Sequence, residues 1–357
     1  MRSLIRILVL SAVFVTIGFY VNLNEKDNNE VLIKEDHTSE KDQALYQNHD
    51  KSNKSSTSTE KPEQGLGLLI GQDISSLISE LGEPQRIDES LYGYQWYIYN
   101  IDYSRYVQVG VKENEVVTVY AIGEELDISP FKIGQPVEEI YNSQYISTNL
   151  DIELNGNTYR FELDDMDFNI RPLVLLGDVF VQLYIDKFTG KLSSVRFLNK
   201  EILIKQRPYE LIYRGELIEP EDPNELVWQK IEESAAREIF DITNVLRIRH
   251  NLQPLLWDEQ TASVAFGHSK DMAENNDFSH TSKTHGDLSD RLKAAEVLYQ
   301  SAGENIAANY TDGPAAVEGW LNSKGHREAL LNKEFSHLGV GVYQKHYTQN
   351  FIQKFEE

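Results

Sequence analysis

Hydrophobic and polar positions divide the chain into stretches of different character. The run Ile7–Leu23 carries no charge and follows Arg2 and Arg6, whereas residues 24–64 are almost entirely polar. A basic start followed by an apolar run is typical of a secretion signal or a signal anchor. The run is about as long as the shortest spanning helices, and no convincing small-x-small cleavage site follows it. We therefore favour an uncleaved membrane anchor in residues 1–23 over a cleaved signal peptide, with the remaining chain exported.

Residues 24–64 contain scarcely any hydrophobic side chains, and Lys51–Lys61 (KSNKSSTSTEK) is of low complexity. Such a segment cannot bury enough apolar surface to offset the entropy lost on ordering. The sequence therefore predicts a disordered linker that holds the folded part away from the membrane.

Two segments in the middle of the chain begin with the same dipeptide. Gly71-Gln72 and Gly134-Gln135 are each followed by a strand-rich stretch. Alternation of aromatic or β-branched residues with polar ones is typical of half-buried antiparallel strands. The predicted strands are residues 94–99, 106–111, 116–122, 157–163, 179–185 and 192–197. We predict that residues 65–205 form a domain of two repeats, each a helix followed by an antiparallel β-meander.

Shorter signals in this region concern turns and an acidic run. Gly82 is expected to end the first helix, and residues 186–190 to form a hairpin turn. The run Asp164, Asp165 and Asp167 lacks the spaced Gly and closing Glu of an EF-hand loop. A solvated turn is therefore favoured there over a calcium site. No catalytic constellation is visible, so the region is expected to serve recognition or positioning.

The pattern changes after residues 206–222, which we interpret as a second linker. Asp222 is expected to cap a helix that has Pro223 at its first position and Glu225 in a capping box. Apolar residues then recur at steps of three and four, at Trp228, Ile231, Ala235, Ile239, Ile242 and Leu246. Later elements are expected after Asp258, at 288–295, at 314–323 with Gly325 closing the helix, and in strands at 338–343 and 347–355. Residues 223–357 are therefore predicted to be an α+β domain with helices outside a small antiparallel sheet.

Composition excludes several partners and chemistries. Acidic residues outnumber basic ones 57 to 34, and the formal net charge is −23. This charge argues against binding to nucleic acid, and against non-specific attachment to anionic lipid or wall polymers. The chain has no cysteine, which excludes disulfides, thiol catalysis and Cys-ligated zinc. The absence of disulfides from a protein that is expected to be exported favours a bacterial source.

Five short motifs follow one another in the C-terminal domain. They are N-x-x-R-x-x-H-N-L-x-P-L-x-W-D, F-S-H, G-E-N-I-A, W-L-N-S-x-G-H-R and L-G-V-G. In this order they resemble the bacterial CAP/SCP-like domain of the cysteine-rich secretory protein family, over roughly residues 224–357. The preceding region resembles the CAP-associated domain of Bacillus-type proteins. The resemblance implies an α-β-α sandwich, preceded here by the duplicated α plus antiparallel β-meander domain.

The same resemblance implies a cleft lined by two His and two Glu that can hold zinc or another divalent cation. By motif, His280 and His326 match the two His, Glu304 matches one Glu, and Asn305 follows it in the cleft. Three ligands with open positions can bind Zn²⁺, although more weakly than four. The predicted metal ligands are therefore His280, Glu304 and His326. The alternative is a structural role for each, with the side chains hydrogen-bonded inside the fold.

The second Glu of the family set is expected about three residues after Trp320, where this chain has Ser323. Glu318 lies on another side of that helix and is not expected to replace it. A Ser323–His326 nucleophile–base pair is not favoured, because no orienting acid or nucleophile elbow accompanies it. His268 is expected to be structural. No catalytic residue is assigned.

Three functions of different classes remain open. The favoured one is an extracytoplasmic, membrane-tethered module of the cell envelope that recognises a lipid, a peptide or a wall fragment. The second is a metal-dependent hydrolase or protease that uses His280, Glu304 and His326. The third is a structural envelope or sporulation assembly protein. The family resemblance does not choose among them, so whether the chain is an enzyme stays open.

Overall fold

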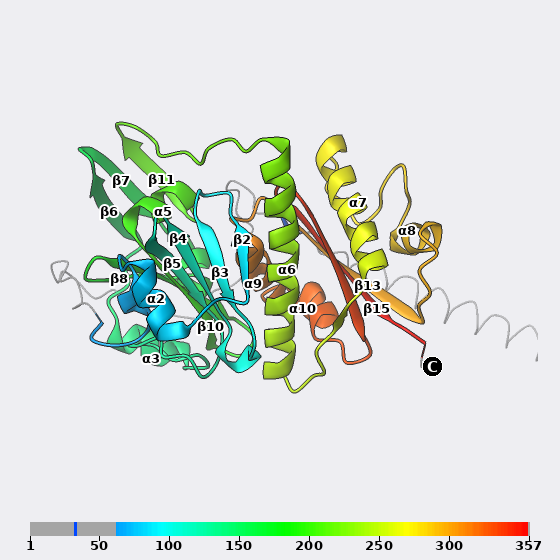
Figure 1. The fold of residues 1–357 in the computed structure, drawn as a ribbon, viewed down its shortest axis with the longest axis horizontal. Helices are drawn as coiled ribbons and strands as arrows, with labels where there is room; N and C mark the ends of the chain where they lie inside the picture. Colours follow the sequence, from blue (N-terminus) through cyan, green and yellow to red (C-terminus); the bar gives the residue numbers. More distant parts are fainter. Residues whose placement is uncertain (1–31, 34–61, 356–357) are drawn as a thin grey trace, which may run out of the picture.

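A computed structural model describes residues 32–33 and 62–355 of the chain. They form two parts that lie side by side, strands with short helices at one end and a helix-flanked sheet at the other (Figure 1). The predicted anchor, residues 1–23, lies outside the described residues, as does most of the predicted linker. Within that linker, Leu32–Ile33 form the short strand β1. None of the helices in the described ranges is long and apolar enough to cross a membrane.

The first part contains two sheets. The seven-stranded sheet has the order β2-β3-β4-β5-β10-β9-β8, and the three-stranded sheet has the order β11-β7-β6. The strands are β2 Arg86–Glu89, β3 Gln95–Tyr99, β4 Val107–Lys112, β5 Glu115–Ala121, β6 Asn149–Leu154, β7 Asn157–Glu162, β8 Leu173–Leu176, β9 Val179–Asp186, β10 Lys191–Leu198 and β11 Glu210–Arg214. The helices are η2 Leu66–Leu69, α2 Ile74–Leu81, η3 Tyr103–Arg105, α3 Val137–Ser143, α4 Asp165–Ile170 and α5 Lys200–Gln206.

All six strands predicted from the sequence are present. The three of the first predicted repeat form a meander, β3-β4-β5, but the three of the second do not. The strand predicted at 157–163 is β7, which leaves the large sheet and pairs with β6 and β11. Strand β11 itself lies within residues 206–222, which were predicted to be a linker. The acidic run predicted as a solvated turn instead begins α4, where Asp164 caps the helix and Asp167 is buried against Arg171.

The two Gly-Gln segments make matching backbone contacts. Gly71 N–H donates to the carbonyl of Val116 on β5, and Gly134 N–H donates to that of Leu192 on β10. Both glycines have a positive φ, of 82° and 80°, which side-chain-bearing residues rarely adopt. The strands β5 and β10 pair with each other at the centre of the sheet. These contacts agree with a duplication, which stays a prediction.

The central strands of the large sheet, β4, β5, β9 and β10, are buried on both faces, contrary to the expected half-buried strands. Strand β9 is buried at all eight positions. One face packs on α2 and α3, and the other faces the C-terminal domain. The polar residues of the alternating pattern therefore point into a domain interface, where Gln108, Thr118, Ser194 and Arg196 are fully buried.

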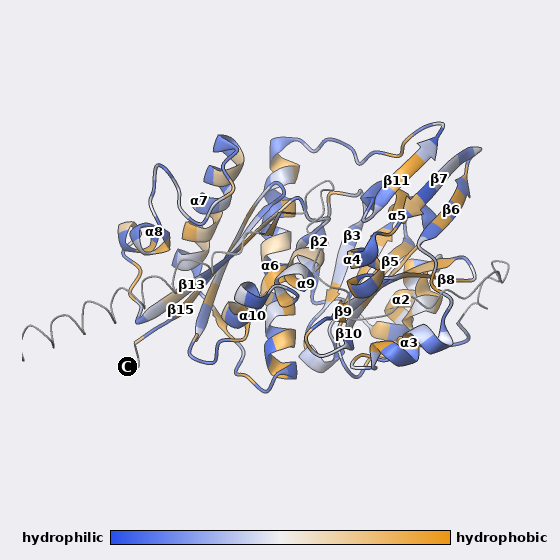
Figure 2. Ribbon diagram, turned by 180° about the vertical axis from the view of Figure 1, so that it is seen from behind, coloured by the Kyte–Doolittle hydropathy of each residue, from blue (hydrophilic) through white to orange (hydrophobic). Residues whose placement is uncertain are grey.

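The C-terminal domain is built on a five-stranded sheet of order β1-β13-β15-β14-β12. Its elements are α6 Glu225–Arg249, β12 Leu256–Trp257, α7 Glu259–Asn275, α8 Leu288–Ala294, β13 Ser301–Ala308, α9 Gly313–Leu321, α10 Lys324–Leu330, β14 His337–Tyr343 and β15 His346–Gln353. Figure 2 shows hydrophobic and hydrophilic residues alternating along α6, whose apolar stripe faces the core. The domain confirms the α+β prediction.

Two predicted helix boundaries in this domain are wrong. The N-cap of α6 is Asn224, whose Oδ1 accepts from Val227 N–H at 3.1 Å, so Pro223 precedes the helix. The helix predicted at 314–323 is α9, which ends at Leu321, and Gly325 lies inside the next helix, α10, rather than ending α9. The expected caps at Asp258 and Gly82 are confirmed.

Two glycines of β14 allow α7 to lie directly on the sheet. A Cβ at Gly341 would stand 1.8 Å from the backbone nitrogen of Phe266, and one at Gly339 would stand 2.2 Å from that of Ala262. These contacts explain the L-G-V-G motif by close packing of backbone on backbone.

We expect Gly341→Ala to lower the free energy of unfolding by about 1–3 kcal/mol or more, because α7 must move away from β14. Gly267→Ala is the matched control. Gly267 lies inside α7 with no atom within 4 Å of its missing Cβ, so the alanine should stabilise by about 1 kcal/mol through helix propensity. Urea denaturation measures both, and equal effects would contradict the packing account.

The two domains share one hydrophobic core. A single cluster joins Trp96 and Tyr120 of the first domain to Ile239 and Trp320 of the second. Among the described residues, every buried hydrophobic side chain lies between residues 66 and 352. A fragment that begins at residue 62 therefore keeps these side chains, although it loses the short strand β1, which pairs with β13. The domains are therefore packed together and do not swing on the segment that joins them.

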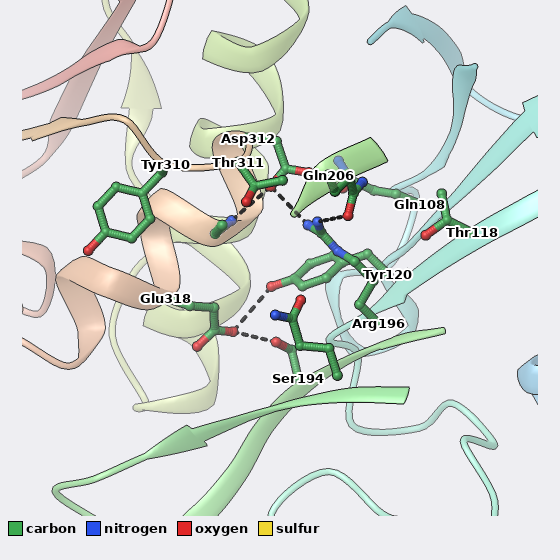
Figure 3. A network of polar contacts seen from close by, with 12 residues as sticks. Gln108, Thr118, Tyr120, Ser194, Arg196, Gln206, Tyr310, Thr311, Asp312 and Glu318 are labelled. Atoms are coloured by element: carbon green, nitrogen blue, oxygen red, sulfur yellow. Dashed lines mark hydrogen bonds and ion pairs between the residues drawn. The ribbon is translucent and has the colours of Figure 1, made fainter. Parts of the chain in front are cut away.

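Several polar side chains inside this interface are paired across it (Figure 3). Glu318 of α9 accepts hydrogen bonds from Tyr120 at 3.2 Å, Ser193 at 3.1 Å and Ser194 at 2.5 Å. Burial raises the pKa of the Glu318 carboxyl. Arg196 is fully buried and bonds to Asp312 at 2.9 Å.

At the edge of the interface, Arg327 of α10 holds Asp186 of β9 with two hydrogen bonds, of 3.1 and 3.0 Å. The two side chains are only 14% and 8% exposed. We expect Arg327→Ala to lower the free energy of unfolding by about 3–5 kcal/mol, because it leaves a buried carboxylate without its partner.

The control for Arg327→Ala is Arg160→Ala, which breaks an ion pair with Asp151 at side chains that are 51% and 70% exposed. Its expected cost is under about 1 kcal/mol. Urea denaturation of both variants measures the difference, and a loss at Arg327 no greater than at Arg160 would contradict the interface account.

Candidate functional site

The sequence-predicted site residues come from three elements of the C-terminal domain. His280 lies between α7 and α8, Glu304 and Asn305 lie on β13, and His326 lies on α10. The imidazole rings of His280 and His326 are 6.3 Å apart between centroids, at an interplanar angle of 28°. The fold therefore brings the two histidines together, as their motifs imply.

Glu304 is the centre of this cluster. Its side chain is 4% exposed, and its Oε1 is 3.0 Å from Nδ1 of His280. Its Oε2 accepts from Arg291 of α8 at 2.5 Å. A third histidine, His268 of α7, places Nε2 within 3.8 Å of Oε1. Both carboxylate oxygens are therefore already in contact with nitrogen groups of the chain.

The charge state of Glu304 follows from these contacts. Burial raises the pKa of Glu304. The hydrogen bond from His280 and the positive charge of Arg291 together lower it by more, so the pKa lies below its usual value. Glu304 is therefore ionised at neutral pH. Burial lowers the pKa of His268, which keeps that imidazole neutral.

The second histidine is held from two sides. Nδ1 of His326 is 2.7 Å from Oγ of Ser323, the residue that stands in the expected place of the second Glu. Nδ2 of Asn305 donates to the backbone carbonyl of His326 at 3.0 Å. Ser323 and Asn305 therefore fix the position and orientation of this ring.

Glu318 points away from the histidines into the domain interface, as expected from its place on the helix. It therefore does not complete the set of two His and two Glu.

The arrangement does not fit a three-ligand zinc site. Glu304 is engaged by Arg291, and a guanidinium beside the cluster repels a cation. Over residues 32–33 and 62–355, no group of three or more His, Asp or Glu is placed to hold a metal ion. No chemical step is assigned to a metal here.

The sequence reasoning missed two members of the cluster. Arg291 does not belong to any of the five motifs. The sequence feature that could have located it is the capping box of Asp287 and Asp290, which fixes the start of α8 and therefore the position of Arg291 on that helix. His268 was expected to be structural, but neither of its ring nitrogens has a hydrogen-bond partner among the described residues. Its contact with Glu304 crosses from α7 to β13, so helix spacing could not show it.

A separate groove of about 920 Å³ opens between α6, α7 and β14. Its lining includes the aromatic residues Trp228, Trp257, Phe266 and Tyr343. None of His280, Glu304, Asn305 or His326 lines it. The domain thus has a compact polar cluster and, elsewhere, a groove large enough for a ligand.

Comparison with known proteins identifies the class to which this architecture belongs. A family model described as CAP-associated N-terminal matches residues 70–209, and that of the cysteine-rich secretory protein family matches residues 240–355. The chain belongs to the CAP (cysteine-rich secretory protein) family, in the form that carries a CAP-associated domain before the CAP domain.

Particular relatives support this membership. The uncharacterized membrane protein YlbC of Bacillus subtilis is 51% identical over 294 residues, which cover 82% of this chain and 85% of the relative. A crystal structure of an extracellular protein containing a SCP domain, from Bacillus anthracis, has a TM-score of 0.78 at 46% identity, covering 87% of this chain and 100% of that one. A cysteine-rich secretory protein from Staphylococcus aureus has a TM-score of 0.74 at 32% identity, covering 83% and 97%.

The depressed pKa of Glu304 predicts a pH-dependent contribution to stability. The contribution is present above the unfolded-state pKa of about 4.3 and is lost as the pH falls through the lower folded-state pKa. We expect Glu304→Gln to lower the free energy of unfolding by about 3–5 kcal/mol at pH 7, because Arg291 stays buried without its counter-charge. The difference from the unsubstituted chain should shrink in acid, where Glu304 becomes protonated.

Urea denaturation at neutral and acidic pH measures this difference. Glu328→Gln, at an exposed position of α10, is the control and should change little at either pH. A loss at Glu304 that is independent of pH would show that the carboxylate charge is not what stabilises the cluster.

Proposed function

We propose that this chain is a binding module of the cell envelope, tethered outside the membrane by residues 1–23. Its ligand-binding surface is the groove between α6, α7 and β14, and this groove is the observation that carries the proposal. Its volume of about 920 Å³ lies in the range of ligand sites. The polar cluster around Glu304 serves, in this proposal, to hold the loop and helices of the CAP domain in place.

The walls of the groove indicate the chemistry of the ligand. Four glutamates line it, Glu225, Glu232, Glu233 and Glu259, against two basic residues. Both basic groups already lie over aromatic rings, Arg237 at 3.9 Å from the centroid of Trp257 and Lys270 at 5.7 Å from that of Tyr343. Glu259 also pairs with Arg237 at 3.8 Å, and Glu232 accepts from Gln344 N–H at 2.8 Å. The lining still carries more carboxylates than basic groups, which favours a cationic ligand and disfavours anionic lipids and wall polymers.

A cationic peptide fits this surface best. Aromatic side chains supply contact area for its aliphatic stems, and the carboxylates pair with its ammonium groups. The first domain, locked to α6 through the shared core, serves as a rigid support. A relative named as a membrane protein and a similar structure described as extracellular support the proposed location.

The test is binding of an octalysine peptide to the fragment that begins at residue 62, by isothermal titration calorimetry. We expect Glu225→Lys/Glu233→Lys to weaken binding about tenfold or more, because it reverses two exposed charges of the groove. Glu328→Lys/Glu334→Lys makes the same change in net charge outside the groove and should leave the affinity nearly unchanged. Equal loss in both double variants would contradict the groove as the binding site.

A Zn²⁺ titration of the same fragment distinguishes this proposal from the alternative function, a metal-dependent hydrolase. Stoichiometric binding that is lost in both His280→Ala and His326→Ala would favour the hydrolase. Octalysine binding without stoichiometric Zn²⁺ would favour recognition.

A further inference from the structure

We propose that strand β11 pairs with β11 of a second copy of this chain, so that the three-stranded sheets of two subunits join into one. The strand is Glu-Leu-Ile-Tyr-Arg, residues 210–214, at the edge of the order β11-β7-β6. This dimer rests on features of the first domain and does not depend on the groove.

The outer edge of β11 is open. The strand pairs with β7 on one side, and no other strand of residues 32–33 and 62–355 pairs with it. Ile212 is 53% and Tyr213 is 47% exposed, and Figure 2 shows hydrophobic residues along the strand. Edge strands of monomeric proteins are usually protected by short length, charged side chains, proline, a bulge or a covering element. Strand β11 has no proline and no bulge, and its two charged residues stand only at its ends.

The hydrogen-bond pattern shows which backbone groups face outward. In an antiparallel pair of strands, two residues that lie opposite each other form either two backbone hydrogen bonds or none, and these two kinds of pair alternate along the strands. Leu163 N–H donates to Thr148 O, in register with the β6–β7 pair. The backbone groups of the odd-numbered residues of β7 therefore bond to β6, and those of its even-numbered residues bond to β11. Since Ile212 is opposite Arg160, the N–H and C=O groups of Leu211 and Tyr213 face the open edge.

The side chains are complementary to a second copy of themselves. In an antiparallel pair centred on Ile212, Glu210 lies opposite the partner's Arg214, and Arg214 lies opposite the partner's Glu210. Leu211 then lies opposite the partner's Tyr213, and these are the residues whose backbone groups face outward. This single register therefore provides partners for the outward-facing N–H and C=O groups and pairs opposite charges at both ends of the strand. It also places Ile212 against Ile212 of the second copy.

The two-fold symmetry of this register indicates which strand pairs with the open edge of β11. Pairing about Ile212 is isologous, so it closes on itself and produces a dimer rather than a fibre. Another extended segment could form the backbone bonds, but it would need its own Arg and Glu at the same spacing. A second copy of this chain provides both.

The experiment is sedimentation equilibrium of the fragment that begins at residue 62, from micromolar to near-millimolar concentration. The unsubstituted fragment should show reversible dimerisation. Glu210→Arg and Arg214→Glu should each weaken it about tenfold or more, because each places like charges opposite each other at both ends. Mixing the two variants should restore a heterodimer, in which both ends again pair opposite charges.

Glu153→Arg is the control, because it reverses an exposed charge on β6, at the other edge of the same sheet. It should leave dimerisation unchanged. A fragment that stays monomeric throughout would overturn the proposal. So would a dimer that both single charge reversals leave intact, since its contact would then lie elsewhere, or two variants that do not associate when mixed.

Discussion

The central strands of the seven-stranded sheet are covered on both faces, and their polar residues are buried against the CAP domain. Arg196, Asp186 and Ser194 would be on the solvent side if the domain stood alone. Each instead meets a group of the second domain, since a buried charge is tolerated only when it is paired. The position of α9 and α10 relative to the sheet is thereby fixed by Glu318 and Arg327. Helix α6, which forms one wall of the groove, packs in the same interface.

The sequence was informative wherever a signal is local. Strand positions, the caps at Asp258 and Gly82 and the two histidines of the F-S-H and G-H-R motifs all depend on a few neighbouring residues. Strand partners were harder, because the pattern of β7 is the same whether it joins the large sheet or a separate one. The alternation of β9 and β10 was also misleading, since polar residues facing another domain have the same period as residues facing water.

The candidate site shows the same limit. His280, Glu304 and His326 could be named from motifs, but what Glu304 does depends on Arg291 and His268, which reach it from other elements. Their contacts are set by tertiary packing and leave no spacing in the sequence. The groove was likewise invisible, because its walls come from α6, α7 and β14, and it exists only after these elements have packed. The family resemblance therefore located the polar cluster around Glu304 and missed the larger groove.

The shared core also has a thermodynamic meaning. The two family models divide the chain near residues 209 and 240, yet the cluster that contains Trp96 and Trp320 crosses that division. Two segments that bury one core together depend on each other for that burial, since separating them returns its apolar surface to water. The family models therefore mark two segments of sequence, while the folded chain joins them through one shared cluster. Cutting the chain at the family boundary would expose an apolar face on each half and favour aggregation.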